Sequence, residues 1–155
     1  MSKAGADETF MREALRTARR AGTRGEVPVG AVLVRGGRIL SRAANATLGR
    51  KDPTAHAEVM VLRRGARLLG NHRLPGCVLY VTLEPCLMCL GAMIQARIDR
   101  CVFGAADPKK GAADWLVLPA LRRGLNHRLR LDGGVLAAPA GELLRGFFRA
   151  RRGKR

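Results

Sequence analysis

The spacing of hydrophobic residues in the first quarter of the chain predicts a helix followed by a β-hairpin. Between Asp7, a suitable N-cap, and Gly22, a suitable stop, apolar side chains share one face of a 3.6-residue repeat; they are Phe10, Met11, Ala14, Leu15 and Ala18. A β-rich run follows over residues 29–34, and Gly36-Gly37 separates it from a second short strand over residues 38–41. Two glycines between two strand-like runs indicate a tight turn.

The rest of the chain alternates helices with apolar strands. A helix over about residues 55–69 ends at Gly70-Asn71, and the apolar run Cys77–Leu83 is typical of a strand buried on both faces. The other expected elements are a helix over about residues 86–96, a strand over residues 100–103, a strand over residues 129–131 and a helix over about residues 139–152. This alternation predicts an α/β layered fold.

The length of the chain favours a single domain. It has 155 residues, 47% of them hydrophobic, which is enough for one compact core. No internal repeat or low-complexity linker interrupts it. We therefore expect one domain over residues 1–155, with about residues 150–155 forming a basic tail.

The charge of the chain is strongly basic. Lys and Arg number 29 against 12 Asp and Glu, a formal net charge of +17 at pH 7. Such an excess attracts polyanions, nucleic acid first among them, although an arginine-rich composition bias is the alternative. The N-terminus lacks the apolar segment of a signal peptide, and no uncharged apolar run reaches the ~18 residues of a membrane span. We expect a cytoplasmic protein with no membrane partner, where a Cys-x-x-Cys pair binds metal or is redox-active.

Two short motifs carry the candidate chemistry. His56-Ala57-Glu58 opens one expected helix, and Cys86-Leu87-Met88-Cys89 opens the next. Cys86 and Cys89 lie three residues apart, on one face of a helical turn, so both sulfurs can reach one metal ion. One His nitrogen and two thiolates give zinc three protein ligands and leave its fourth position to water, whose pKa zinc lowers towards ~7. This donor set predicts a catalytic zinc site rather than a structural one.

Glu58 is the expected proton-transfer group. It lies two residues after His56 and therefore points elsewhere on the helix than a same-face ligand does. In this position it is better placed to reach the zinc-bound water than the zinc ion. We expect it to take the proton of that water, to protonate the ring nitrogen under attack and then to protonate the leaving amine.

Other interpretations of these residues are simpler. A lone Cys-x-x-Cys pair also occurs in redox motifs, which need no upstream His-x-Glu, and in zinc fingers, which need a fourth ligand. Cys101 and His72 are the spare candidates, and neither has finger spacing. Cys77 and Cys101 are interpreted as buried thiols and Glu84 as a favourable charge at a helix start, while His127 is left unassigned. Four residues wrap the helix after Cys86, in a pattern that fits a deep core or a dimer contact; they are Met88, Leu90, Met93 and Ile94.

Together the two motifs form the known signature of zinc-dependent nucleobase deaminases. The chain resembles the bacterial tRNA-specific adenosine deaminases of the cytidine and deoxycytidylate deaminase superfamily, from about Phe10 to Arg152. The segments that carry the resemblance are residues 26–32, 49–58, 79–86, 102–105, 125–128 and 147–149. The chain departs from that family at Ala106, where a basic residue is common, and at Asp114-Trp115, where the family has small polar residues.

The resemblance implies a three-layer α/β/α cytidine-deaminase-like fold with a central mixed five-stranded sheet, acting as a homodimer. It implies one zinc ion per subunit on His56, Cys86 and Cys89, with Glu58 as the catalytic proton donor. The implied substrate is adenosine at wobble position 34 in a tRNA anticodon stem-loop, that of arginine tRNA in particular. The residues implied to bind it are Val27, Pro28, Val29, Asn45, Pro85, Asp107, Lys109, Phe148 and Arg149.

Asp107 has two interpretations. A carboxylate in a loop that receives a polyanion needs a donor, and the ribose 2′-hydroxyl is the donor that RNA offers and DNA lacks. Asp107 would then favour RNA over DNA. The alternative is a turn-forming Asp before Pro108 that does not touch the substrate.

Two other functions remain open. A small-molecule deaminase acting on cytosine, guanine or a free nucleoside would have the same zinc site, but it would not need a charge of +17. A zinc-stabilised RNA-binding module without catalysis would fill all four metal positions with protein ligands. Such a module would have no use for Glu58 beside the site.

Overall fold

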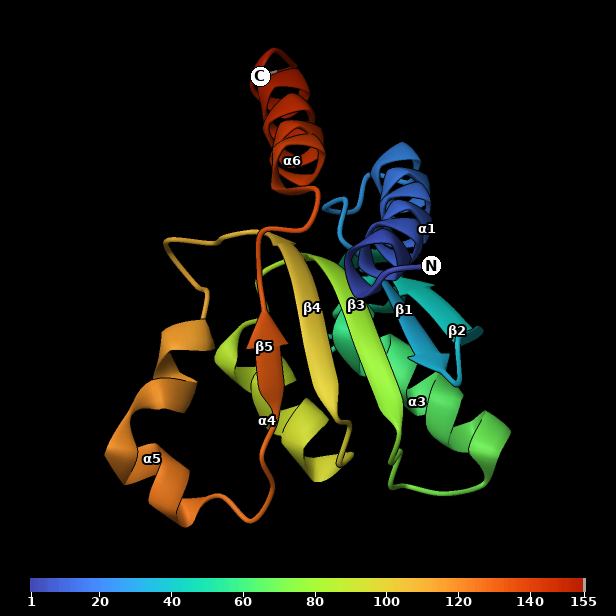
Figure 1. The fold of residues 1–155 in the computed structure, drawn as a ribbon. Helices are drawn as coiled ribbons and strands as arrows, with labels where there is room; N and C mark the ends of the chain where they lie inside the picture. Colours follow the sequence, from blue (N-terminus) through green and yellow to red (C-terminus); the bar gives the residue numbers. More distant parts are fainter. Residues whose placement is uncertain (155) are drawn as a thin grey trace.

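A mixed five-stranded sheet between two layers of helices organises the computed structural model, which describes residues 1–154 (Figure 1). Its strands are β1 (Gly30–Arg35), β2 (Arg38–Ala44), β3 (Cys77–Leu83), β4 (Arg100–Ala105) and β5 (Arg130–Asp132), in the spatial order β2-β1-β3-β4-β5. β1 pairs antiparallel with β2 and β3, whereas β3, β4 and β5 pair in parallel. The expected α/β/α fold and mixed sheet are confirmed.

Helices cover both faces of this sheet. α1 (Lys3–Thr23) and α6 (Ala137–Arg152) pack on one face, and α3 (Ala57–Leu69) and α4 (Leu87–Gln95) on the other (Figure 1). Side chains of β1 alternate between these layers, because successive residues of a strand point to opposite faces. Leu33 belongs to the core under α3 and α4, and Val32 to the core under α1.

None of the helices within residues 1–154 has both the length and the apolar character needed to cross a lipid bilayer.

The hairpin between β1 and β2 has the two-residue turn that its glycines predict. Arg35 pairs with Arg38, and the intervening Gly36 and Gly37 have φ values of 55° and 74°. Positive φ at both central residues defines a type I′ turn, whose twist matches that of the flanking strands. A side chain at either position would strain the backbone.

Some expected boundaries are wrong. α1 begins at Lys3, where the side chain of Ser2 accepts the N–H of Gly5 at 3.1 Å, so Asp7 is not its N-cap. A short helix, α2 (Thr47–Arg50), lies in the expected loop before α3. A 3-10 helix, η1 (Ala113–Val117), and α5 (Pro119–Gly124) form outside the three layers, beyond β5, where only a loop was expected (Figure 1).

The C-terminal helix ends where the sequence predicts and begins two residues earlier. α6 runs from Ala137 to Arg152, so residues 150–152, which were also assigned to a basic tail, complete its last turn. Arg155, the last residue of the expected basic tail, lies outside the described residues.

Asp7 instead belongs to a buried ionic network that ties α1 to the sheet. Its two carboxylate oxygens accept from the Arg100 guanidinium at 2.8 and 2.7 Å, and one also accepts from the Tyr80 hydroxyl at 2.9 Å. Both side chains of the ion pair are less than a tenth exposed. The hydrogen bonds from Arg100, aided by that from Tyr80, lower the pKa of Asp7 below its ordinary value.

Replacing Asp7 with Asn is expected to destabilise the fold by about 1–3 kcal/mol, because the buried Arg100 guanidinium loses one of its two carboxylate partners and keeps only Asp132. For a chain of this size that corresponds to a decrease in Tm of roughly 5 °C. The matched control is Glu8→Gln, which removes the same charge from an exposed neighbour on α1. An equal decrease in Tm for both variants would exclude a stabilising role for the network.

The same network predicts a pH dependence. The folded-state pKa of Asp7 lies below the ~3.9 of an unfolded chain, so the stabilisation is fully present above that value. It is lost as the pH falls from about 4 through the folded-state pKa. Thermal unfolding between pH 7 and 3 should therefore show a smaller loss of Tm in Asp7→Asn than in the parent.

Candidate active site

The two halves of the candidate metal site come from the starts of α3 and α4. His56 is the N-cap of α3 and Cys86 the N-cap of α4, both with extended backbone, and Cys89 lies in the first turn of α4. The Asp52 carboxylate fixes the turn before α3 by accepting the backbone N–H of Thr54 at 2.8 Å. Helix N-termini carry a positive dipole end, which favours thiolate ligands there.

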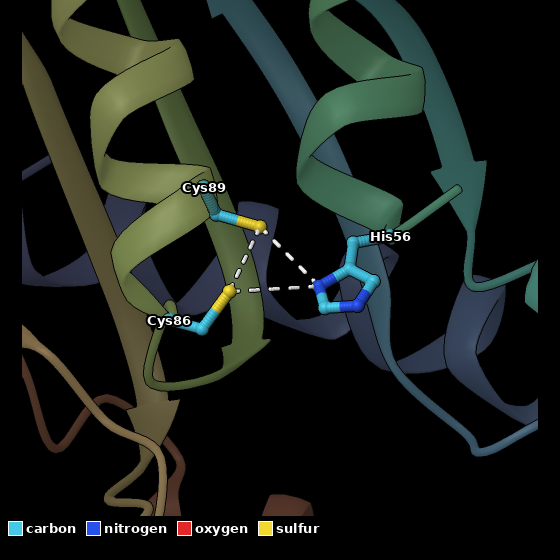
Figure 2. Close-up of side chains that lie close together, drawn as sticks. All are labelled: His56, Cys86 and Cys89. Atoms are coloured by element: carbon cyan, nitrogen blue, oxygen red, sulfur yellow. Dashed lines mark hydrogen bonds between the residues drawn. The ribbon is translucent and has the colours of Figure 1, made fainter. Parts of the chain in front are cut away.

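The donor atoms of these residues have the spacing of zinc ligands (Figure 2). The Cys86 and Cys89 sulfurs are 3.7 Å apart, and the His56 Nδ1 atom lies 3.7 Å from the first and 3.4 Å from the second. Zinc bonds of about 2.3 Å to sulfur and 2.0–2.1 Å to nitrogen, at tetrahedral angles, place two sulfurs about 3.8 Å apart and a sulfur and a nitrogen about 3.5 Å apart. The residues present therefore fit the metal.

The two thiols differ in their proton affinity. Hydrogen bonding with Cys89 and with His56 lowers the pKa of Cys86 to about 3. Contact with Cys86, together with burial, raises the pKa of Cys89 above its ordinary value. The two sulfurs thus compete for one negative charge, and a divalent cation that binds both relieves this competition.

Glu58 lies in the first turn of α3, close to the same cluster. Its side chain is buried at 4% exposure, yet it contributes to the wall of the cavity in front of His56 and Cys86. Burial raises the pKa of Glu58 to about 7, and the charge of His56 lowers it only in part.

A cavity of about 950 Å³ opens in front of His56 and Cys86. Its size is that of a small-molecule or nucleoside pocket. Six residues expected to bind the substrate line it: Val27, Val29, Asn45, Asp107, Lys109 and Phe148. Three expected residues do not. Pro28 faces a second cavity between α1 and α6, Pro85 is buried, and the Arg149 guanidinium pairs with Glu142 at 2.8 Å.

Asp107 has a turn-forming contact in the structure. Its Oδ1 atom accepts the backbone N–H groups of Lys109 at 3.0 Å and Lys110 at 3.1 Å. These bonds support the turn interpretation. The second carboxylate oxygen has no such bond to these amides, so a role towards RNA stays a prediction.

Two carboxylates hold the walls of the cavity, and no sequence motif indicated either. Glu26 is buried and accepts the backbone N–H groups of Leu48 and Gly49 at 3.3 and 2.7 Å, which fixes α2 beside Val27. Glu84 accepts backbone N–H groups of the loop after β4. Both contacts join residues more than 20 positions apart, so no local pattern records them.

The structure also shows the surroundings of the residues whose roles the sequence left open. Cys77 and Cys101 are fully buried in the core under α3 and α4, as expected. His127 contacts the backbone carbonyl of Ile98 through Nε2 at 2.7 Å. Of the residues that wrap α4, Met88 is 38% exposed while Leu90, Met93 and Ile94 are buried within the chain. The cavity lining also includes residues that were not expected there, among them Thr47, Lys110 and Arg145.

Comparison with known proteins places the site in context. Residues 4–105 match the family model described as the cytidine and deoxycytidylate deaminase zinc-binding region. A tRNA-specific adenosine deaminase of Bacillus subtilis is 44% identical over 96% of this chain and 92% of its own length.

Solved structures show the same relationships. One, from a study of A-to-I editing by tRNA:A34 deaminases at the wobble position of transfer RNA, superimposes with a TM-score of 0.82 and 45% identity, over 88% of this chain and 99% of its own. A guanine deaminase of Bacillus subtilis superimposes with a TM-score of 0.62 and 38% identity, over 68% of this chain and 66% of its own. The shared architecture thus serves both RNA and free-base deamination.

Proposed function

The chain belongs to the cytidine and deoxycytidylate deaminase family, among its tRNA-specific adenosine deaminases, and from this premise we propose its substrate and mechanism. It hydrolyses adenosine to inosine, with release of ammonia, at wobble position 34 of a tRNA anticodon, that of arginine tRNA. The whole chain forms one deaminase domain that binds one zinc ion per subunit. A tRNA substrate and reduced thiol ligands fit a cytoplasmic location.

The observation that carries this proposal is the position of a buried carboxyl group beside a three-donor metal cluster at the base of the cavity. His56, Cys86 and Cys89 supply three donors with zinc spacing, and Glu58 lines the same cavity. When bound, zinc activates water as a nucleophile at neutral pH. A zinc-stabilised binding module would need a fourth protein ligand, and the cluster within residues 1–154 contains three.

Glu58 and Asn45 act on the reactants. The Glu58 carboxylate takes a proton from the attacking water and delivers it to the ring nitrogen next to the reacting carbon. It then passes the second proton of that water to the departing amine, which leaves as ammonia, so that the carbonyl of inosine forms. Asn45 lines the cavity from the end of β2, where its side-chain amide can orient the nucleoside.

The mouth of the cavity favours RNA over a free base. Lys109, Lys110 and Arg145 line it from two sides and carry positive charges that a phosphate can contact, with Arg145 also paired to Glu142 at 3.2 Å. A free purine needs none of them. The test is to incubate the protein with unmodified tRNA, adenosine, cytidine and guanine in parallel. We expect product from tRNA alone, whereas turnover of guanine at a comparable rate would support the small-molecule deaminase.

Binding of an anticodon stem-loop is expected to weaken steeply with salt. Each phosphate neutralised in a single-stranded region contributes a slope of roughly −0.7 to log K against log salt concentration. Contacts from these three cations alone predict a slope near −2. Fluorescence anisotropy between 50 and 300 mM salt measures it. An affinity that does not change with salt would mean that the basic excess is a composition bias.

We also propose that the protein acts as a homodimer. Large apolar side chains are exposed on the first turn of α4, on η1 and on α5; they are Leu87, Met88, Trp115, Val117, Leu118 and Leu121. Exposed large apolar side chains of this number are typical of association surfaces. Sedimentation should give twice the chain mass, and Leu118→Glu should shift it towards the monomer. A monomeric parent at micromolar concentration would contradict this assembly.

A further inference from the structure

Glu84 lines the cavity, and its carboxylate is enclosed by another segment of the cavity wall. It lies between β3 and the metal ligand Cys86, separated from that ligand by Pro85 alone. Its Oε2 atom accepts the backbone N–H of Asp107 at 2.8 Å, and its Oε1 atom accepts the N–H of Ala113 at 3.2 Å. One carboxylate therefore binds both ends of the loop over residues 107–113.

The loop closes tightly around this carboxylate. A Cβ atom placed on Gly111 would lie 2.3 Å from Cδ and 2.4 Å from Oε2 of Glu84, so only glycine fits there. The N–H of Gly111 also binds the carbonyl of Asp107 at 2.9 Å, and that of Ala112 binds the carbonyl of Pro85 at 3.0 Å. The segment that carries the metal ligand and the loop are thus joined at several points.

The loop in turn supplies part of the cavity mouth. Asp107, Pro108, Lys109 and Lys110 all line the cavity, and the two lysines are exposed. Without an internal partner, a loop of this length would sample many conformations, and binding would have to order it at a cost in affinity. Hydrogen bonds to a charged acceptor are stronger than neutral ones and hold the loop before the substrate arrives.

We propose that Glu84 is a positioning residue that preorganises the loop over residues 107–113 and thereby sets the affinity for the RNA substrate. It acts through the loop and does not touch the reacting atoms. The inference rests on the proposed function for its substrate. It assigns to Glu84 a contribution to substrate affinity, distinct from the contribution of Glu58 to the chemical step.

The test compares Glu84→Gln with Glu8→Gln, which removes a carboxylate from the exposed face of α1. Gln keeps the size of Glu but replaces one acceptor oxygen with a donor, which cannot accept the second backbone N–H. Hydrogen exchange should be at least tenfold faster in residues 107–113 of Glu84→Gln than in Glu8→Gln. Zinc content should stay the same in both variants.

Kinetics on an anticodon stem-loop supply the second measurement. For Glu84→Gln we expect KM to rise about tenfold, which corresponds to about 1.4 kcal/mol, while kcat changes less than threefold. Gly111→Ala should have the same effect, and the double variant should be little worse than either single one, because all three disturb one contact. Glu8→Gln should behave as the parent.

Three results would overturn the proposal. One is unchanged exchange in residues 107–113 of Glu84→Gln. The second is a fall in kcat with unchanged KM, which would give Glu84 a part in the chemistry. The third is a parallel loss of zinc and Tm, which would make it a general structural residue. If the parent itself does not act on the stem-loop, the proposed function fails, while the exchange measurement still decides the role of Glu84 in the loop.

Discussion

Turnover of adenosine in an anticodon stem-loop is expected to fall by about 10²–10⁴-fold when Glu58 is replaced by Ala, the range that general acid–base groups contribute. Glu58 is the carboxyl group that lines the cavity from within the buried first turn of α3, next to His56. The proposed reaction needs protons moved from water to the ring and to the leaving amine, and this side chain serves each transfer. Its loss should therefore affect kcat far more than KM.

The fold and the metal should survive this substitution. None of the three donor atoms of the cluster belongs to Glu58, so zinc per chain should stay that of the parent. Glu58→Gln, which preserves the side-chain volume at a buried position, separates loss of the proton-transfer group from the effect of a cavity. Turnover within a few-fold of the parent in both variants, measured with zinc present, would remove Glu58 from the mechanism.

Loss of zinc is the expected result of replacing Cys89 with Ala. Its sulfur is one of three donors within 3.7 Å of one another, and two donors hold zinc far less tightly than three. The decrease in zinc affinity should exceed the ~10–100-fold that loss of an outer-shell partner causes. Elemental analysis after dialysis should give about one zinc per chain for the parent and almost none for the variant.

Stability should decrease along with the metal. Zinc that binds the folded but not the unfolded chain raises the free energy of unfolding by about 2.7 kcal/mol at a metal concentration 100 times Kd. This stabilisation is lost with the site. Cys77→Ala is the matched control, since Cys77 is an equally buried cysteine in the same core but is remote from the cluster. A variant Cys89→Ala that keeps its zinc, or a Cys77→Ala that loses it, would contradict the assigned ligand set.

Local patterns predicted the elements that have a clear signature in the local sequence. The apolar run Cys77–Leu83 predicts both ends of β3 correctly, because a strand buried on both faces has few polar positions. The Gly36-Gly37 turn and the stop at Gly70 follow from positive φ values that glycine adopts without strain. The clustering of His56, Cys86 and Cys89 was predictable because both motifs are short local patterns that open helices, while their binding of zinc stays a prediction.

Roles that depend on contacts between residues far apart in the sequence could not be predicted from local patterns. Asp7 has the residue type of an N-cap, but Arg100 and Tyr80, far along the chain, bind its carboxylate. For Glu84, likewise, the sequence indicates a favourable interaction with a helix dipole. In the structure its carboxylate instead accepts the backbone N–H groups of residues 107 and 113. No hydrophobic periodicity in the sequence predicts η1 and α5. Apolar side chains in this stretch, such as Val117 and Leu118, are exposed and therefore do not mark a buried face.

The most direct test of the central claim is to treat unmodified total tRNA with the zinc-loaded protein and to map inosine by sequencing. Inosine is read as guanosine, so each edited position appears as an A-to-G change. We predict conversion at position 34 of arginine tRNA and no conversion with Glu58→Ala. Total tRNA without inosine at position 34, from a preparation that contains one zinc per chain, would contradict the assignment.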